Sequence, residues 1–180
     1  MFGGKEQCIA RLDSLLLAPS VLEGEPSPDI SGMIGQYVHG NEPSHHILYL
    51  YALLGQPHKT AKWVREVLAT QYRDEADGLS GNEDMGQMSA WYILSALGLY
   101  EVEPASGRYW FGSPIIDRAE LSVEGGVFTI EVINNSAEHA AIKAIELNGK
   151  PYTLPYITHQ DIAQGGVLTL VMGDAEVYND

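Results

Sequence analysis

The sequence predicts an α+β protein in which helices come first and strands follow. Up to about residue 100, apolar residues recur every three or four positions, which is the spacing of one face of a helix. Beyond residue 108 they stand in short runs separated by pairs such as Asn-Gly and Gly-Gly, which is typical of strands and tight turns. The change falls near residues 101–108, so we expect a helical region at 1–104 and a β-rich region at 105–180.

Composition excludes several classes of function. The chain has 180 residues and a formal net charge of −14, whereas a nucleic-acid-binding protein should present a basic face. No apolar run reaches the roughly 18 residues that a membrane span needs. Cys8 is the single cysteine, so no disulfide can form within the chain. An acidic chain of this kind suits a cation or a neutral substrate such as a sugar.

The helical region is expected to contain four helices. Lys5 to Leu17 carries an apolar stripe and is followed by Pro19, which cannot continue a helix. The Gly55-Gln56-Pro57 sequence should join two antiparallel helices, and Gly98 should end the last one. The expected ranges are 5–17, 43–54, 57–72 and 88–97. Residues 31–40 fit either a short helix or a packed loop.

The β-rich region should form an antiparallel sheet or a sandwich-like arrangement. Apolar or alternating runs predict strands at 109–111, 118–123, 127–133, 141–147, 152–154 and 167–172. Between the last two, Thr158 and Asp161 have the spacing of a cap, so a single helical turn is expected there.

Two polar clusters each stand directly before an expected helix. Both contain Gly-Asn-Glu, as Gly40-Asn41-Glu42 and as Gly81-Asn82-Glu83, and the second continues with Asp84. Glycine lets the backbone approach a ligand closely, and amide and carboxylate oxygens are the ligands that Ca²⁺ takes. If the two helices point the same way, both loops open on one rim. Two carboxylates facing each other there could divide the work of glycoside hydrolysis.

Simpler interpretations of these residues remain open. A carboxylate before a helix can serve only as a cap, but one aspartate suffices for that, so Asn82 and Glu83 need another role. The histidines at 39, 45 and 46 raise the alternative of a zinc site. Zinc-binding spacing is absent, however, and hydrogen bonding to a sugar, or simple packing, suits His45 and His46 better.

These motifs resemble a known family, the glycoside hydrolase family 92 α-mannosidases. The resemblance runs in order along nearly the whole chain, through the segments 39–46, 55–60, 81–91, 98–100, 112–114, 147–151 and 159–162. It implies that residues 1–104 are the C-terminal helices of an (α/α)6 catalytic barrel, with 105–180 as a β-rich region packed on it. Four helices cannot complete such a barrel, so we expect a fragment of a chain several times longer.

The resemblance also implies an activity for the parent protein. Members are calcium-dependent, inverting exo-α-mannosidases, and we expect an α-1,2-type enzyme that removes terminal mannose from glycans, including N-glycans. By position in the motif, Asp84 is the expected general base. Asn82 and Glu83 flank it in the catalytic group, although many relatives carry an acidic residue where Asn82 stands. This departure leaves open which residue assists the base.

The first polar cluster is expected, on the same resemblance, to hold the metal and the sugar. Asn41 and Glu42 match the loop that helps to bind Ca²⁺ and the mannose. The expected sugar-binding residues are His39, Glu42, His45 and His46.

The general acid is expected upstream of Met1, which predicts that residues 1–180 alone hydrolyse nothing. The parent is expected to be bacterial and periplasmic or extracellular, and the rest of its chain should be the fragment's main partner. Apolar surface left where other helices belong would allow the fragment to dimerise. The alternative function is a non-catalytic module that binds carbohydrate or calcium, and residues 109–180 are expected to act mainly as a scaffold.

Overall fold

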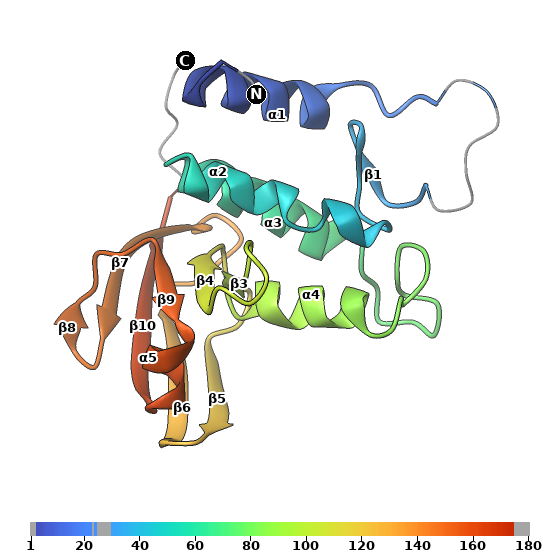
Figure 1. Cartoon of the computed structure of the whole chain (residues 1–180). Helices are drawn as coiled ribbons and strands as arrows, with labels where there is room; N and C mark the ends of the chain where they lie inside the picture. Colours follow the sequence, from blue (N-terminus) through green and yellow to red (C-terminus); the bar gives the residue numbers. More distant parts are fainter. Residues whose placement is uncertain (1–2, 23, 25–29, 175–180) are drawn as a thin grey trace.

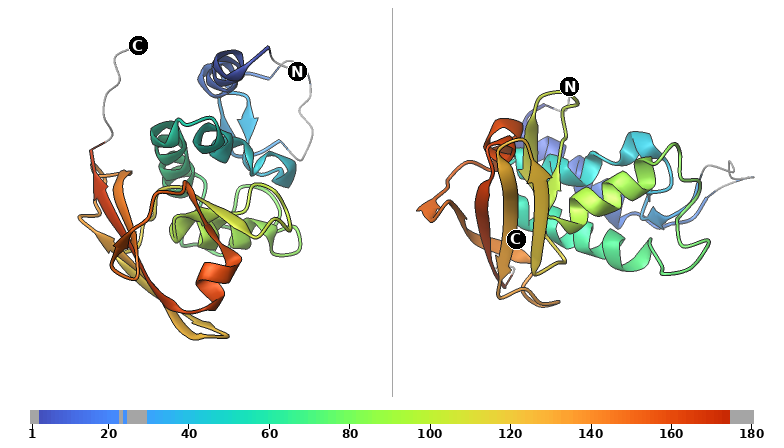
Figure 2. Two further views of the ribbon diagram at one scale, coloured as in Figure 1. Left: turned by 60° about the vertical axis from the view of Figure 1, so that its left-hand side comes forward. Right: turned by 90° about the horizontal axis from the view of Figure 1, so that it is seen from below.

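The computed structural model describes residues 3–22, 24 and 30–174. A helical part and a β part lie side by side, and Figure 1 shows the helices stacked above and beside the strands. Figure 2 shows from two further directions that the strands form a layer of their own. No helix within the described ranges has the length and apolar character that crossing a bilayer requires.

The helical part follows the sequence closely, with one exception. The helices are α1 (Lys5–Leu17), α2 (Leu50–Leu53), α3 (Pro57–Thr70) and α4 (Gln87–Ala96). The ranges of α1, α3 and α4 confirm the periodicity, and Gly98 follows α4 with a φ of 80°. The helix expected over 43–54 is wrong as a continuous element. It is split into two 3-10 segments, Glu42–Ser44 and Ile47–Tyr49, and the short α2.

A threonine from the next helix explains part of this interruption. The Thr60 hydroxyl donates to Leu48 O at 2.9 Å and accepts from Ala52 N at 2.9 Å. Leu48 O and Ala52 N are the pair that an uninterrupted α-helix would join directly. The hydroxyl therefore bridges the two groups that one backbone hydrogen bond of a continuous helix would join. It also links α2 to α3.

Residues 31–40 form a small hairpin instead of a helix or a loop. The strands β1 (Met33–Ile34) and β2 (Tyr37–Val38) pair in an antiparallel register. Gly35 turns between them at φ 60°, and a Cβ there would lie 2.5 Å from the carbonyl oxygens of Leu15 and Leu16. The turn therefore packs against the end of α1, which requires a glycine.

The β part consists of two sheets. The larger has the strand order β5-β6-β10-β7-β8, with β5 (Arg118–Val123), β6 (Gly126–Ile133), β10 (Gly166–Gly173), β7 (Ala141–Leu147) and β8 (Lys150–Pro151). The smaller has the order β3-β4-β9, with β3 (Leu99–Tyr100), β4 (Arg108–Phe111) and β9 (Tyr156–Thr158). The short helix α5 (His159–Ala163) lies between β9 and β10 and has the expected capping box of Thr158 and Asp161.

Two expectations about the strands are wrong. The larger sheet is mixed, because β10 inserts between β6 and β7 and runs parallel to β6 while it is antiparallel to β7. The strand expected at 152–154 does not form, and β8 and β9 lie on either side of it. Tyr152 N donates to Ile145 O at 2.8 Å, but Pro155 has no amide hydrogen to extend that pairing.

Each part has its own apolar core, and Arg65 links them. Leu48, Val64 and Trp91 are in the helical core, and the β core includes Phe128. The Arg65 guanidinium on α3 donates to loops of the β part, at 2.8 Å to Ser113 Oγ, 2.6 Å to Asn135 Oδ1 and 3.3 Å to Ser136 O, and also to Pro114 O. This set of bonds fixes α3 against the β part.

Candidate active site

The two Gly-Asn-Glu loops meet at their glycines. A Cβ on Gly81 would lie 3.2 Å from Gly40 O, and one on Gly40 would lie 2.6 Å from Ser80 O. Asn41 and Asn82 follow these glycines directly, so both loops leave from one point of contact. The expected convergence of two loops that are far apart in sequence is therefore present. Figure 1 shows them at the end of the helical part that is distant from the larger sheet.

Ser31 lies at this contact, and its side chain explains why both positions 40 and 81 require glycine. Its Oγ would be 2.1 Å from a Cβ on Gly40 and 2.7 Å from a Cβ on Gly81. The same Oγ is buried and has no hydrogen-bond partner within the described ranges. The serine side chain therefore fills the space that two missing Cβ atoms leave, and any larger residue at position 40 or 81 would push the loops apart.

Glu83 caps the start of α4, a role that we had expected an aspartate to have. Its carboxylate accepts from Ser89 N at 3.0 Å and from Ser89 Oγ at 2.9 Å, in the first turn of α4. A negative charge at this end of a helix also opposes the helix dipole. The capping interpretation thus applies to Glu83, whereas Asn82 and Asp84 are exposed at the loop surface.

The turn that carries Asp84 has an unusual backbone. Asp84, Met85 and Gly86 have φ values of 50°, 60° and 91° in succession. A residue with a side chain costs about 1–2 kcal/mol in the left-handed region. Gln87 N donates to Asp84 O at 3.2 Å and Met88 N donates to Glu83 O at 3.3 Å, so the turn is held from the helix side. Such conformations cluster at functional sites.

The two histidines of the first cluster are buried beneath the loops. The exposed fraction is 0% for His39 and 1% for His45, and their rings stack with centroids 4.8 Å apart. His45 Nε2 donates to His39 O at 3.0 Å, while Gln87 Nε2 donates to His45 Nδ1 at 3.1 Å. Trp91 Nε1 adds a bond to His45 O at 3.1 Å. Helix α4 is therefore tied to the first loop through His45.

His39 joins two tyrosines in a directed chain of hydrogen bonds. Tyr72 OH donates to Met88 O at 3.1 Å, so it accepts from His39 Nε2–H at 2.7 Å. The other ring nitrogen, Nδ1, then accepts from Tyr37 OH at 2.8 Å. This arrangement needs a neutral imidazole, because an imidazolium would have no acceptor for the Tyr37 hydroxyl.

The electrostatics of the cluster agree with neutral histidines. Burial and, to a smaller extent, the neighbouring His45 together lower the pKa of His39 to about 3. Burial also lowers the pKa of His45. Burial raises the pKa of Tyr72, and the nearby Glu83 carboxylate adds to this. The cluster therefore supports the loops through hydrogen bonds and carries no positive charge near pH 7.

The sugar-binding role expected for the histidines stays a prediction. All ring nitrogens of His39 and His45 have partners within the protein, whereas His46 and Glu42 are exposed. His46 and Glu42 are thus the two expected sugar-binding residues that this structure leaves accessible.

Several residues at the candidate site are not evident from the sequence. Ser31, Tyr37, Tyr72 and Gln87 lie outside the Gly-Asn-Glu motifs, and only Gln87, one residue after Gly86, is close enough in sequence to have been suspected. Ser31 and Tyr72 come from separate elements, so no local pattern indicates them.

The residues expected to bind calcium offer the right type of ligand atom but fewer atoms than the ion needs. Asn41 and Glu42 are exposed and offer amide and carboxylate oxygens. Ca²⁺ takes six to eight oxygen ligands. Within residues 3–22, 24 and 30–174, no three His, Cys, Asp or Glu side chains are grouped so that they could hold a metal. The side chains of Asn41 and Glu42 alone would therefore not complete the coordination of a calcium ion.

Comparisons with known proteins identify close relatives of the chain. The family model described as "Glycosyl hydrolase family 92 catalytic domain" matches residues 1–174. A curated protein of Arthroderma benhamiae, named an uncharacterized secreted glycosidase, is 29% identical over 180 residues, which are 98% of this chain and 21% of that protein.

Solved structures agree with this match. A family 92 α-mannosidase of Bacteroides thetaiotaomicron, in complex with mannoimidazole, is 40% identical with a TM-score of 0.88, over 94% of this chain and 22% of that one. A family 92 inverting mannosidase of the same bacterium is 38% identical with a TM-score of 0.80, over 97% of this chain and 25% of that one. The chain thus spans about a fifth to a quarter of the length of these relatives.

The contact between the two loops can be tested with Gly40→Ala. Because the new methyl group would overlap Ser31 Oγ and Ser80 O, we expect the free energy of unfolding to fall by about 1–3 kcal/mol. Amide hydrogen exchange should quicken in residues 39–45 and in residues 80–83 together. Gly149→Ala is the control for a general loss of stability: a Cβ there has nothing within 4 Å, but its φ of 71° strains an alanine, so this variant should lose stability without faster exchange in the two loops. Faster exchange in one loop alone would show that the loops are independent.

The neutral histidine cluster predicts a stability that depends on pH. The pKa of His39 is lower in the folded chain than its ordinary 6.5, so its contribution is complete above pH 6.5 and is lost as pH falls toward 3. We expect a loss of up to about 1.4 kcal/mol for each pH unit in this window.

Denaturant unfolding between pH 7 and 4.5 measures this dependence. His39→Gln cannot titrate, so its stability should fall less steeply than that of the wild type. His45 still contributes in the same direction, so some slope remains. Identical slopes for the two proteins would contradict a depressed pKa at His39.

Proposed function

The chain belongs to glycosyl hydrolase family 92, and from this membership we propose that it is part of an exo-α-mannosidase catalytic domain. The solved relatives at 38% and 40% identity are named mannosidases, and the match covers nearly the whole chain. Because the chain spans only part of their length, hydrolysis is proposed for the parent protein. The helices α1 to α4 would be the C-terminal helices of an (α/α)6 barrel, with the β part as the scaffold packed on them.

The meeting of the two loops at Gly40 and Gly81 carries the proposal for the site. It supports a site to which both the turn with Asp84 and the loop that begins with Asn41 contribute. In an inverting mechanism, one carboxylate activates water on the face of the sugar opposite the leaving group. Asp84 is exposed and sits in a turn fixed from the helix side, which suits this role. Asn82 is a neutral amide, so it can orient the water but cannot take its proton.

Calcium is proposed as the cofactor, with Asn41 and Glu42 as its contribution from this chain. When bound, the ion would polarise sugar hydroxyls and favour the distorted ring of the transition state. Its other oxygen ligands would come from the rest of the parent, from water and from the sugar. His46 and Glu42 would contact the mannose, while His39 and His45 would hold the loop in position. The inverting outcome, the α-1,2 linkage and N-glycan substrates rest on the family resemblance.

Export of the parent has indirect support. The curated relative of Arthroderma benhamiae is named a secreted glycosidase. A bacterial parent is proposed because the two solved relatives come from a bacterium. A periplasmic or extracellular location is proposed because the family resemblance is to enzymes that degrade glycans outside the cell. The alternative function, a module that binds sugar or calcium without chemistry, predicts the same loops but no role for Asp84 as a base.

The substitution Asp84→Asn in the parent separates these functions. Asparagine tolerates the left-handed backbone at this position, so the turn should survive. Loss of the general base should lower kcat by about 10²–10⁴-fold. Mannose affinity, measured by titration calorimetry, should change little. Asp74→Asn, in the same acidic loop, is the matched control and should leave kcat unchanged. An unaltered kcat in Asp84→Asn would favour the binding module.

Residues 1–180 by themselves should not hydrolyse mannosides. An inverting mechanism needs both an acid and a base, and no residue of this chain matches the family's general acid. The measurement is mannose release from mannobiose with added calcium, with the parent enzyme as the positive control. Clear turnover by the fragment would mean that the acid lies within it, and Glu42 would be the first residue to substitute.

A further inference from the structure

Gln87, the first residue of α4, makes hydrogen bonds to both halves of the candidate active site. Its side-chain Nε2 donates to His45 Nδ1 at 3.1 Å. Its backbone N donates to Asp84 O at 3.2 Å. His45 follows Glu42 by three residues in the first loop. One residue therefore connects the turn that carries the proposed base to the loop proposed to hold calcium and the sugar.

The bond from Gln87 to His45 depends on the tautomer of the histidine. His45 Nε2 lies 3.0 Å from His39 O, and a carbonyl oxygen can only accept, so the hydrogen of the neutral ring is on Nε2. Nδ1 is then an acceptor and needs a donor. Because His45 is buried, water cannot readily replace the Gln87 amide at this nitrogen. Gln87 thus supplies the donor that the ring of His45 requires.

The amide of Gln87 is also held from the β part. It interacts with the hydroxyl of Tyr100 on β3, where it opposes part of the rise that burial causes in the pKa of Tyr100. The ring of Tyr100 stacks on the buried Tyr49, with centroids 4.8 Å apart. Gln87 itself is half-buried. Its side chain is therefore fixed by packed residues of the interior, although it starts one residue beyond the exposed turn.

We propose that Gln87 is a positioning residue for hydrolysis in the parent, and that it holds the turn with Asp84 in a fixed place relative to residues 41–46. The inference rests on the proposed role of Asp84 as the general base. The base, the attacking water and the sugar must be aligned, and a displacement of about 1 Å can cost about 10²-fold in rate. Asp84 is exposed, so its place depends on the bonds that its neighbours make.

The variant Gln87→Met in the parent tests this role. Methionine has a similar length but no donor, so we expect kcat to fall about 10–100-fold. Mannose affinity, measured by titration calorimetry, should change less than about threefold, because the groups that bind the sugar remain. Gln87→Asn keeps the amide but is one methylene shorter, so it should not reach His45 and should lose a similar part of kcat. Retention of kcat within about twofold in Gln87→Met would overturn the proposal.

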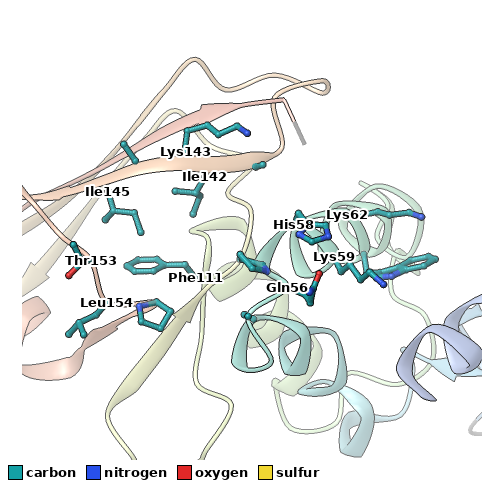
Figure 3. Close-up of a pocket in the computed structure, with 18 of the residues that line it drawn as sticks. Gln56, His58, Lys59, Lys62, Phe111, Ile142, Lys143, Ile145, Thr153 and Leu154 are labelled. Carbon is teal, nitrogen blue, oxygen red and sulfur yellow. The ribbon is translucent and has the colours of Figure 1, made fainter. Parts of the chain in front are cut away.

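Gln56→Met is the matched control for loss of a half-buried glutamine. Gln56 stands before α3 and lines an open groove between the α2–α3 hairpin and the β part, as Figure 3 shows. The two loops of the candidate site lie at the end of the helical part that is distant from the larger sheet. The control should therefore keep its kcat. A loss equal to that of Gln87→Met would mean that the effect is not specific to position 87, and would count against the proposal.

Combination with Asp84→Asn separates positioning of the base from general damage to the fold. If Gln87 acts through Asp84, then Gln87→Met should lower kcat by less than about twofold once the base has been removed. The same fractional loss in both backgrounds would overturn the proposal, because Gln87 would then act independently of the base. An unchanged kcat in Asp84→Asn alone would instead contradict the proposed function, so the two failures are distinguishable.

Discussion

The close approach of Gly40 and Gly81 is the constraint on which the candidate site depends. The backbones approach so closely that a Cβ on Gly81 would lie 3.2 Å from Gly40 O, with Ser31 Oγ filling the remaining space. Their contact makes one rigid base from two segments some forty residues apart. The contact between the glycines therefore helps to position the polar residues that follow them.

Hydrogen bonds between buried neutral groups lie below this contact and join the elements around it. His39 bonds to two tyrosines and His45 bonds to Gln87, so α4, the β1–β2 hairpin and the end of α3 are joined at one place. These interactions are between neutral groups in a buried setting, where a charged histidine would be costly. A positive charge directly beneath the loops would also compete with a bound cation. The neutral cluster is therefore compatible with a calcium ion above it.

Local patterns predict part of the fold, and contacts between distant residues determine the rest. The ranges of α1 and α3 follow from apolar periodicity, and the Thr158–Asp161 capping box follows from spacing alone. The break before α2 depends on Thr60 from another helix, which no pattern within residues 43–54 contains. The position of β10 between β6 and β7 is likewise a property of the sheet as a whole. For the site, the two motifs were evident, but the buried tyrosines beneath them were not.

The adjacent residues Glu83 and Asp84 of the second loop have different surroundings. Glu83 binds the first turn of α4 through Ser89, and this anchors the loop. Anchoring at Glu83 is what allows Asp84 and Met85 to remain in the left-handed region, since the cost of about 1–2 kcal/mol for each must be offset by fixed neighbours. Asp84 is exposed in this turn. Because Glu83 makes the bonds to Ser89, the proposed role of Asp84 as the general base is compatible with a stable start of α4.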